Sequence, residues 1–281
     1  MATIKPSFTV DKINQYLQKY RSITFKSGVY KITKMMICPS NTIVHCEPGV
    51  IFERYCRYQM LEMEASPDVT GYNGTHDVTW DGGIFKADKR PEDAIVIVLY
   101  HCKNIILRNI VVDGCRGYHS IECNSSCGVR IENCLFSNQS AIEGEEFREA
   151  IQIDFAYDLG YPYRGEYGNP ASDGTHCKDI TIDSCEFRSV PNGIGTHTVY
   201  EKAKYHENIV ISNCYFSNIK GNSIQLLSMK DVYIDFKTFM NNSTGFVLGK
   251  RNKGYTLDGK KVKLSSTRYN VNVSISNVFV E

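Results

Sequence analysis

The chain has 281 residues and a formal net charge of +1 at pH 7. So small a charge gives no electrostatic reason to expect binding to nucleic acid or to an anionic membrane surface. No run approaches the ~20 apolar residues needed to cross a bilayer. The opening segment MATIKPSFTV also lacks the apolar core of a signal peptide. We therefore expect a partner that is neither nucleic acid nor a membrane.

The first predicted element is a short helix at residues 10–20. Val10, Ile13, Leu17 and Tyr20 fall on one face of this helix. The segments that follow, SITFKSGVYKIT and PSNTIVHCEPGVIFE, lead into a repetitive region. An amphipathic helix ahead of a repetitive core is predicted to cap the open end of that core, as the terminal units of solenoids must.

From residue 77 onward a nine-residue phrase recurs along the chain. Each copy alternates apolar and polar residues, which is the periodicity of a strand. The first six of seven copies start at residues 77, 104, 128, 179, 208 and 231, so the spacings between them are 27, 24, 51, 29 and 23 residues. Units this short cannot bury their own apolar face, so they must stack as coils of a solenoid. The copies are DVTWDGGIF, NIILRNIVV, GVRIENCLF, DITIDSCEF, NIVISNCYF, DVYIDFKTF and NVSISNVFV.

Stacking the copies predicts columns of like side chains ~4.8 Å apart. The leucine-rich repeat, the rival solenoid, needs a recurrent leucine consensus that the copies lack. Asn tolerates left-handed backbone, so the Asn column at the bend is predicted to be structural. The inward column at the ninth position is Phe85, Val112, Phe136, Phe187, Phe216, Phe239 and Val280. The polar column at the bend is Asn109, Asn133, Asn213 and Asn277.

The eleven cysteines also follow the repeat. Cys134, Cys185 and Cys214 occupy the same position of three copies, which indicates stacked packing residues. A disulfide framework suits small secreted chains, and no pair of cysteines has the spacing of a zinc site. We expect reduced, buried thiols, no metal site and no cofactor.

This repeat pattern resembles the right-handed parallel β-helix of the pectate-lyase-like superfamily over roughly residues 22–281. The resemblance implies an all-β, single-stranded parallel β-helix solenoid, with residues 1–281 as one domain. The segments EAIQID, DGTHCKDITI and GIGTHT resemble those of uncharacterised bacterial and phage members. The enzymes nearest to these are polygalacturonase-type glycoside hydrolases and phage tail-spike depolymerases, which implies a polysaccharide or oligosaccharide ligand. The adjacent aspartate pair and the Gly-His-Gly of polygalacturonases are missing, so no catalytic role carries over by identity.

A second short strand follows each phrase, and its polar residues mark the candidate site. Aligning Ile121, Ile151, Ile194 and Ile224 inward makes the intervening residues face outward. We expect these to form an exposed polar face, four coils tall. One outward column is Glu122, Gln152, Gly195 and Gln225. The next is Asn124, Asp154, His197 and Leu227, and the residues entering at the turn are His119, Glu149, Asn192 and Asn222.

A long insertion, residues 155–176, directly follows EAIQID. Long structured loops on rigid scaffolds usually have a function, and tyrosines can stack on sugar rings. Tyr161, Tyr163 and Arg164 are therefore candidate substrate contacts. Asp173 is either a catalytic candidate or a turn aspartate.

Hydrolysis of a glycosidic bond needs a carboxylic acid and a second carboxylate. The strand geometry places the backbones of Glu122 and Asp154 ~8 Å apart, within the ~6.5–9.5 Å range of inverting enzymes. We hypothesise that Asp154 is the base, Glu122 or Glu149 the acid, and His197 the residue that orients the base. The candidate substrate-binding residues are Gln152, Gln225, Asn124, His119, Asn192, Arg164, Tyr161 and Tyr163.

Three other functions stay open. A polysaccharide lyase often uses Ca²⁺ with Arg or Lys; Arg148 and Arg164 are available, but no aspartate cluster resembles a calcium cage. A non-catalytic glycan-binding virion adhesin and a purely structural solenoid are the others. Without a signal peptide, the expected location is the cytoplasm or a phage tail. Tail spikes are commonly trimers, so a homotrimer is allowed by the resemblance, although the sequence does not demand one.

Overall fold

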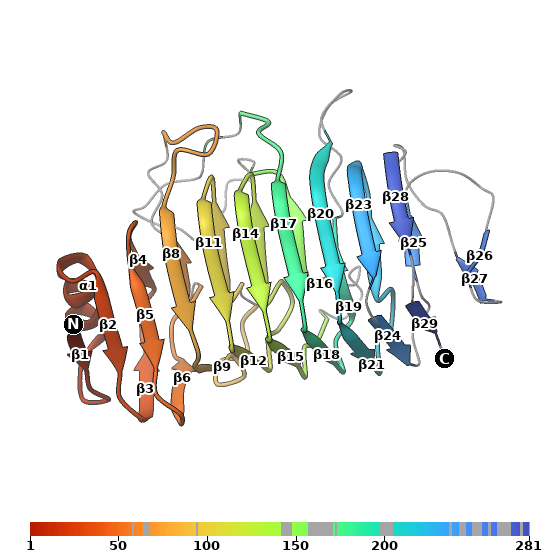
Figure 1. The fold of residues 1–281 in the computed structure, drawn as a ribbon. Helices are drawn as coiled ribbons and strands as arrows, with labels where there is room; N and C mark the ends of the chain where they lie inside the picture. Colours follow the sequence, from red (N-terminus) through yellow and green to blue (C-terminus); the bar gives the residue numbers. More distant parts are fainter. Residues whose placement is uncertain are drawn as a thin grey trace.

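The computed structural model describes residues 1–57, 59–63, 68–93, 95–141, 148–156, 171, 173–196 and 205–235, and the strand segments 238–241, 246–248, 255–257, 260–262, 271–275 and 278–280. Over this part the chain forms the predicted parallel β-helix (Figure 1). Each coil gives one strand to each of three sheets, so neighbouring strands mostly differ by three in number. No helix in the described ranges is long and apolar enough to span a bilayer.

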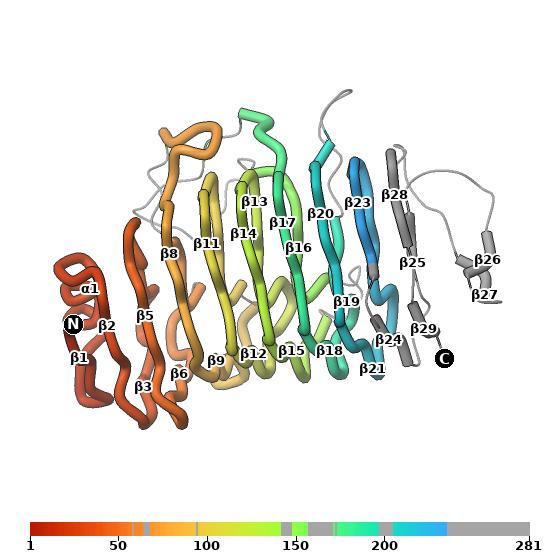
Figure 2. The backbone as a smooth tube through the Cα atoms, in the orientation of Figure 1, coloured from red at the N-terminus to blue at the C-terminus, as the bar shows by residue number. Residues whose placement is uncertain are grey.

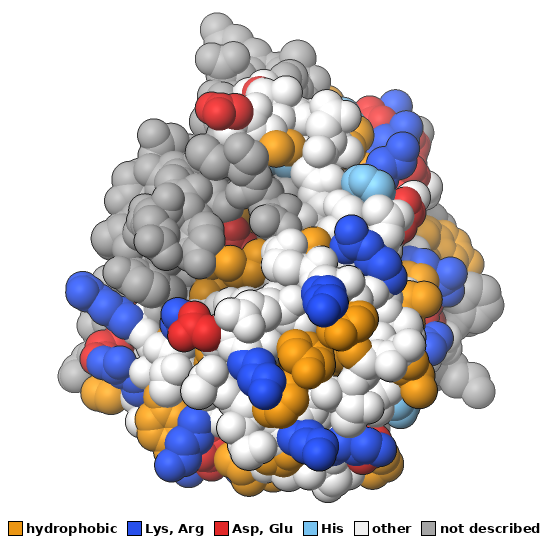
Figure 3. All heavy atoms as spheres, turned by 90° about the vertical axis from the view of Figure 1, so that its left-hand side faces the viewer, with side chains coloured by type: hydrophobic (Ala, Val, Ile, Leu, Met, Phe, Trp, Pro, Cys, Tyr) orange, Lys and Arg blue, Asp and Glu red, His pale blue; other side chains and the backbone are white. Residues whose placement is uncertain are grey.

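The N-terminal helix α1 (Val10–Lys19) covers the first coil, as predicted. Thr9 caps the helix by accepting a hydrogen bond from the backbone N–H of Lys12. Val10, Ile13 and Leu17 are buried in the main core. Their burial closes an end of the stack that would otherwise expose apolar side chains to water. Figure 3 looks onto this end and shows Lys and Arg side chains around smaller apolar patches.

The ten-stranded sheet carries the first part of each nine-residue phrase. All of its neighbouring strands are parallel, and it runs the length of the molecule (Figure 1). In spatial order its strands are β1 (Ala2–Ile4), β2 (Ser22–Phe25), β5 (Ile43–Cys46), β8 (His76–Asp81), β11 (Lys103–Arg108), β14 (Cys127–Glu132), β17 (Lys178–Asp183), β20 (His206–Ser212), β23 (Met229–Asp235) and β28 (Val271–Ile275).

The nine-stranded sheet carries the end of each phrase and follows after a tight bend. Its strands are β3 (Gly28–Ile32), β6 (Val50–Arg54), β9 (Ile84–Lys86), β12 (Val111–Asp113), β15 (Leu135–Ser137), β18 (Glu186–Arg188), β21 (Tyr215–Ser217), β24 (Thr238–Asn241) and β29 (Val278–Val280).

The eight-stranded sheet carries the second short strand of each coil. Its strands are β4 (Met36–Cys38), β7 (Leu61–Met63), β10 (Ile97–Tyr100), β13 (Ile121–Asn124), β16 (Glu149–Asp154), β19 (Asn192–Gly195), β22 (Ile224–Leu226) and β25 (Phe246–Leu248). A short antiparallel pair, β26 (Tyr255–Leu257) and β27 (Lys260–Val262), stands apart from the three sheets.

The predicted inward columns are present and form the core. Phe136, Phe187 and Phe216 are fully buried, and their rings lie 5.1 and 4.6 Å apart between neighbouring centroids. The prediction that Phe239 continues this column is wrong. Phe239 pairs in register with Tyr215, and Met240 pairs with Phe216. The copy DVYIDFKTF therefore holds one more residue at its bend than its neighbours do.

The asparagines at the bend have the structural role that their column predicts. Asn109 and Asn133 have φ values of 57° and 52°, in the left-handed region. The amide of Asn109 donates to Asp81 Oδ1 at 2.6 Å, and that of Asn133 donates to Asn109 Oδ1 at 2.6 Å. These bonds tie each bend to the coil before it. Asn277 lies outside the described residues.

All eleven cysteines are free, and ten of them are buried. The stacked Cys134, Cys185 and Cys214 donate weak hydrogen bonds to backbone carbonyls of their own and neighbouring coils. Burial raises the pKa of the Cys134 and Cys185 thiols well above the ordinary value. These thiols are packing residues, as the repeat predicts.

Candidate functional site

The eight-stranded sheet brings the predicted polar residues together on its outer side. We call the set Glu122, Asn124, Glu149, Gln152, Asp154 and Gln225 the polar wall. It spans strands β13 to β22, which lie side by side in Figure 2 behind the strands of the ten-stranded sheet. The register is the predicted one: Asn124 pairs with Asp154. The other column is Glu122, Gln152, Gly195 and Gln225.

The polar wall is not exposed, which differs from the expectation. Glu122 and Gln152 are 1% exposed and Asp154 is 0% exposed. One reason is that a small apolar cluster, separate from the core, packs on this side of the sheet. Its members are Ile95, Val98, Tyr100, Ala156 and the partly buried Tyr118. Glu122, Gln152 and Asp154 are therefore shielded from solvent, whereas Gln225 is partly buried.

Two side chains donate hydrogen bonds to the carboxylate of Glu122. The Asn124 amide donates to Oε1 at 2.7 Å, and the Tyr100 hydroxyl donates to Oε2 at 3.4 Å. Donors directed at both oxygens hold the carboxylate in one orientation. The oxygen of the same Asn124 amide, Oδ1, is buried and has no hydrogen-bond partner. Such an orphaned acceptor is uncommon and is available to a ligand hydroxyl.

Asp154 is held in a similar way on the next coil. Its Oδ1 accepts from the backbone N–H of Phe155 at 2.9 Å, and its Oδ2 accepts from the Gln152 amide at 3.2 Å. The backbone of residue 156 is anchored beside it, because Ala156 N donates to Ser125 Oγ at 2.8 Å. These bonds fix the Asp154 carboxylate in one orientation.

Glu149 reaches the wall from the start of β16. The Glu149 side chain fills the space that Gly195, without a side chain, leaves in its column, since a Cβ added at Gly195 would lie 2.9 Å from Glu149 Cγ. Beside it, His119 is 3% exposed. The Nδ1 of His119 lies 2.8 Å from the Glu149 carbonyl oxygen and 3.8 Å from Glu149 Oε2. The wall thus gathers three carboxylates, on the coils of β13 and β16.

The turn residues at the far coils have local structural partners. Asn192 is 4% exposed, and its Oδ1 accepts from the backbone N–H of Asn222 at 2.7 Å. The Gln225 amide donates to the Thr196 carbonyl at 3.2 Å, while its Oε1 accepts from the Asn222 amide at 3.0 Å. These contacts place Asn192 and Gln225 at the edge of the wall nearest the C-terminus.

Asp173 has the turn role rather than a place on the wall. Its Oδ1 accepts from the backbone N–H of Thr175 at 2.8 Å, and its Oδ2 accepts from that of Gly71 at 2.7 Å. Partial burial raises the pKa of Asp173, but these hydrogen bonds outweigh it and leave the pKa below its ordinary value. Asp173 thereby joins the loop before β8 to the segment before β17. The candidates His197, Arg164, Tyr161 and Tyr163 lie outside the described residues.

Tyr100 and Glu62 belong to the same outer face but were missed from the sequence. Tyr100 pairs in register with Asn124, and Glu62 pairs with Val98, which pairs with Glu122. Both side chains are 2% exposed. Aligning Ile97 with Ile121 would have placed Tyr100 in the Asn124 column.

The described residues include no cluster of three or more His, Cys, Asp or Glu side chains arranged to hold a metal ion. The wall is instead a set of carboxylates and carboxamides. Such groups can accept hydrogen bonds from sugar hydroxyls, donate to them, and transfer protons.

No family model and no curated protein matches this sequence. Solved structures share its right-handed parallel β-helix fold. The surface protein and adhesin PfbA of Streptococcus pneumoniae superposes with a TM-score of 0.72 at 17% identity, over 96% of this chain and 72% of that one. The catalytic unit of a GH87 α-1,3-glucanase from Streptomyces thermodiastaticus gives 0.57 at 10%, over 96% and 47%. An iota-carrageenase of family GH82 from A. fortis gives 0.51 at 14%, over 82% and 55%. At these identities the likeness defines the fold alone.

Proposed function

We propose that this protein is a glycoside hydrolase that cleaves a polysaccharide or oligosaccharide at the polar wall. The observation that carries the proposal is the burial of carboxylates on one outer face: Glu122 and Glu149 at 1% exposure, Asp154 at 0% and, two coils before Glu122, Glu62 at 2%. Removing a carboxylate from water costs several kcal/mol. The fold itself does not require them, because Val98 and Val247 occupy the Glu122 column on flanking coils.

The hydrogen bonds suggest how the roles divide. Both Glu122 and Asp154 receive two donors, which hold each carboxylate in one orientation for a role as a base or as a stabiliser of an oxocarbenium-like transition state. Asp154 is the proposed base, and Glu122 stabilises positive charge on the sugar. Glu149 is then the proposed acid that protonates the leaving oxygen. Asn124 Oδ1, the orphaned acceptor, is proposed to bind a sugar hydroxyl.

The similar structures support this proposal by what their names state. One is a glucanase and another a carrageenase, so the same fold carries glycoside hydrolysis in those proteins. This chain spans about half the length of each of them, 47% and 55%. The activity proposed here therefore rests on the wall rather than on the likeness.

A second candidate is a glycan-binding adhesin. It is favoured by the match to the adhesin PfbA, which superposes over 96% of this chain, and by the exclusion of the wall from solvent. An adhesin would bind a glycan without breaking it. Turnover of the glycan, and not affinity for it, therefore distinguishes an adhesin from a hydrolase.

The test is release of reducing ends from a panel of bacterial and plant polysaccharides. We expect wild-type protein to release them and Asp154→Asn to lose about 10²–10⁴-fold in rate, the usual contribution of a positioned acid or base. Glu149→Gln and Glu122→Gln should show comparable losses. Asp68→Asn, at an exposed aspartate away from the wall, is the matched control.

Three other results are distinguishable in the same assay. Binding without release of reducing ends would support the adhesin. Products with an unsaturated uronate chromophore would indicate a lyase. Turnover that survives Asp154→Asn unchanged would refute the assignment of the base.

A further inference from the structure

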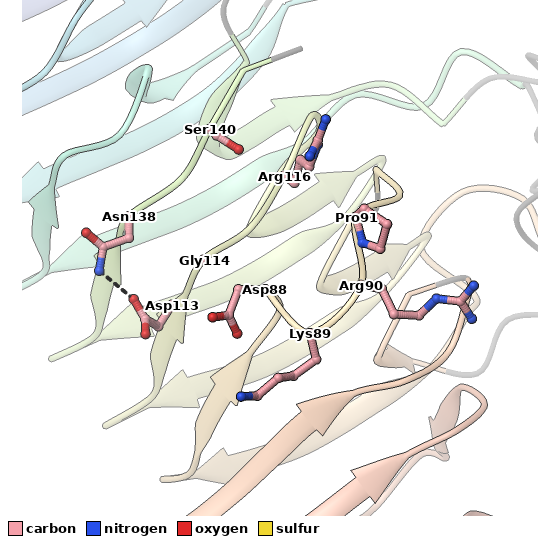
Figure 4. A pocket seen from close by; sticks show the side chains of 9 residues that line it. All are labelled: Asp88, Lys89, Arg90, Pro91, Asp113, Gly114, Arg116, Asn138 and Ser140. Carbon is pink, nitrogen blue, oxygen red and sulfur yellow. Dashed lines mark hydrogen bonds between the residues drawn. The ribbon is translucent and has the colours of Figure 1, made fainter.

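A polar cavity lies apart from the polar wall, at the corner where the chain passes from the nine-stranded sheet to the eight-stranded sheet. It has a volume of about 480 Å³ and is lined by residues 88–91, 113, 114, 116, 138 and 140 (Figure 4). These are the turns after β9, β12 and β15, on three successive coils. No residue of the polar wall lines it. We call it the corner pocket.

The corner pocket is held rigidly. Arg54, fully buried, donates to the carbonyl of Glu92 at 2.7 Å and so fixes the loop that forms one side. Arg90 donates to the carbonyl of Tyr55 at 3.1 Å, which turns its guanidinium away from the other side chains (Figure 4). The other two turns are joined by backbone hydrogen bonds, including one of 2.8 Å from Gly117 to Ser140. A site that is already formed loses less entropy when a ligand binds.

The charges of the lining largely cancel. Lys89 lies 3.8 Å from Glu53, and the guanidinium of Arg116 lies 3.5 Å from Asp93. The carboxylate of Asp113 accepts from the Asn138 amide at 2.8 Å and also lies 3.7 Å from Lys86. Because Lys89, Arg116 and Asp113 each lie beside an opposite charge, the pocket has no strong net field that would select an anion or a cation.

What remains is a ring of mixed donors and acceptors. Lys89 and Arg116 present N–H donors, Asp88 presents carboxylate acceptors, and the Ser140 hydroxyl does both (Figure 4). A hydroxyl group also both donates and accepts, so a polyhydroxylated ligand matches this lining. The lining includes no aromatic ring, and the volume lies in the ~300–1,000 Å³ range of small-ligand sites.

The corner pocket adjoins the start of the wall strands. Gln139, between the lining residues Asn138 and Ser140, is 6% exposed. Its amide donates to the Tyr118 carbonyl at 2.8 Å, and its Oε1 accepts from Ser120 Oγ at 3.0 Å. Ser120 directly precedes β13. Gln139 thus separates the pocket from the edge of the wall where His119 and Glu149 enter.

We propose that the corner pocket binds one neutral sugar unit through its hydroxyl groups, as an accessory site of a saccharide chain. The inference rests on the proposed function in one respect, since it takes the ligand of both sites to be a saccharide. It does not require hydrolysis. Asp88 and Lys89 form hydrogen bonds with the sugar hydroxyls, and Arg116 and Ser140 supply further hydrogen bonds.

The test is a titration of the isotope-labelled full chain, followed by backbone amide chemical shifts. The probes are neutral oligosaccharides of glucose, galactose and mannose, and an oligosaccharide of galacturonate. We expect at least one neutral probe to shift the amides of Gly114 and Ser140. Asp88→Asn and Lys89→Gln should each weaken this binding about tenfold, because each removes a charge-assisted hydrogen bond. Asp68→Asn and Lys5→Gln make the same charge changes at exposed positions outside the pocket lining and should have no effect.

Three outcomes would overturn the inference. In the first, none of the neutral probes shifts these amides, and in the second, Asp88→Asn and Lys89→Gln both bind as wild type does. Shifts by the galacturonate probe alone, abolished by salt, would also overturn it and indicate an anion site. The proposed function fails separately. In that case Asp154→Asn leaves reducing-end release unchanged, whatever happens at Gly114.

Discussion

Replacing Gly195 with Ala adds one methyl group to the middle of the polar wall. The new Cβ would lie 2.8 Å from the carbonyl oxygen of Gln225 and 2.9 Å from Glu149 Cγ. The Gln225 carbonyl cannot retreat easily, because it accepts from Thr196 N at 2.9 Å. The side chain of Glu149 can move, since its Cγ is part of a flexible stem. We therefore expect Gly195→Ala to displace the proposed acid and to strain the backbone contact between β19 and β22.

The two consequences differ in size. Overpacking costs about 1–3 kcal/mol, and the loss of glycine's freedom in the unfolded chain returns about 0.4–1 kcal/mol. The net destabilisation is then about 1–2 kcal/mol, which lowers the midpoint of thermal unfolding by roughly 2–8 °C. A displacement of about 1 Å at a catalytic group can cost about 10²-fold in rate. Activity should therefore fall far more than stability does.

The assay pairs reducing-end release with thermal unfolding followed by circular dichroism. The comparison variant is Gly193→Ala, whose Cβ would lie 2.3 Å from the Ser223 carbonyl and 2.5 Å from the Phe216 ring, inside the core. We expect Gly193→Ala to lower the unfolding midpoint more than Gly195→Ala does. Near-normal turnover in Gly195→Ala, with its stability lowered as expected, would refute the placement of Glu149 in the reaction.

Two further predictions concern stability. Phe187→Ala removes a fully buried ring that is stacked on both sides, and should cost about 3–5 kcal/mol in urea unfolding; a loss below about 1 kcal/mol would contradict the stacked core. Partial burial raises the pKa of Asp183, but hydrogen bonds from Ser212, Asn213 and Ser184 outweigh it and leave that pKa below the ordinary value. Its contribution to stability is therefore present above pH ~3.9 and lost as the pH falls through the lower folded-state pKa. Asp183→Asn should flatten this part of an acid unfolding curve, and an unchanged curve would count against the bend network.

The repeat made the fold predictable because each coil obeys the same local constraints. A phrase with period-two alternation and a left-handed Asn at its bend fixes which residues face inward. That pattern was sufficient to place Glu122 beside Gln152 and Asn124 beside Asp154, as the register shows. It failed at Phe239, where an extra residue at the bend shifts the register by one.

The burial of the wall could not be predicted from the repeat. Period-two alternation shows which side of a strand a residue faces, but not what packs on that side. The covering is built by residues such as Tyr118 and Ala156, which belong to turns without a repeated pattern. Tyr100 was missed for a related reason: its strand is otherwise apolar, so it does not stand out until it is aligned with β13.

One double variant, Glu122→Val with Tyr100→Phe, tests whether the polar wall stabilises the fold or serves the proposed activity. It copies the apolar choice of the preceding coil, where Val98 pairs in register with Glu122. Replacing buried charge by a packed apolar residue is often neutral or stabilising by 1–4 kcal/mol. The Asn124 amide loses its carboxylate partner, which costs about 1–3 kcal/mol. These two changes in the free energy of unfolding nearly cancel. If the polar wall serves the proposed activity, the double variant should have a stability within about 2 kcal/mol of wild type and should lose turnover. A wall kept for structure predicts a loss of about 3–5 kcal/mol instead, the usual cost of breaking a buried polar network.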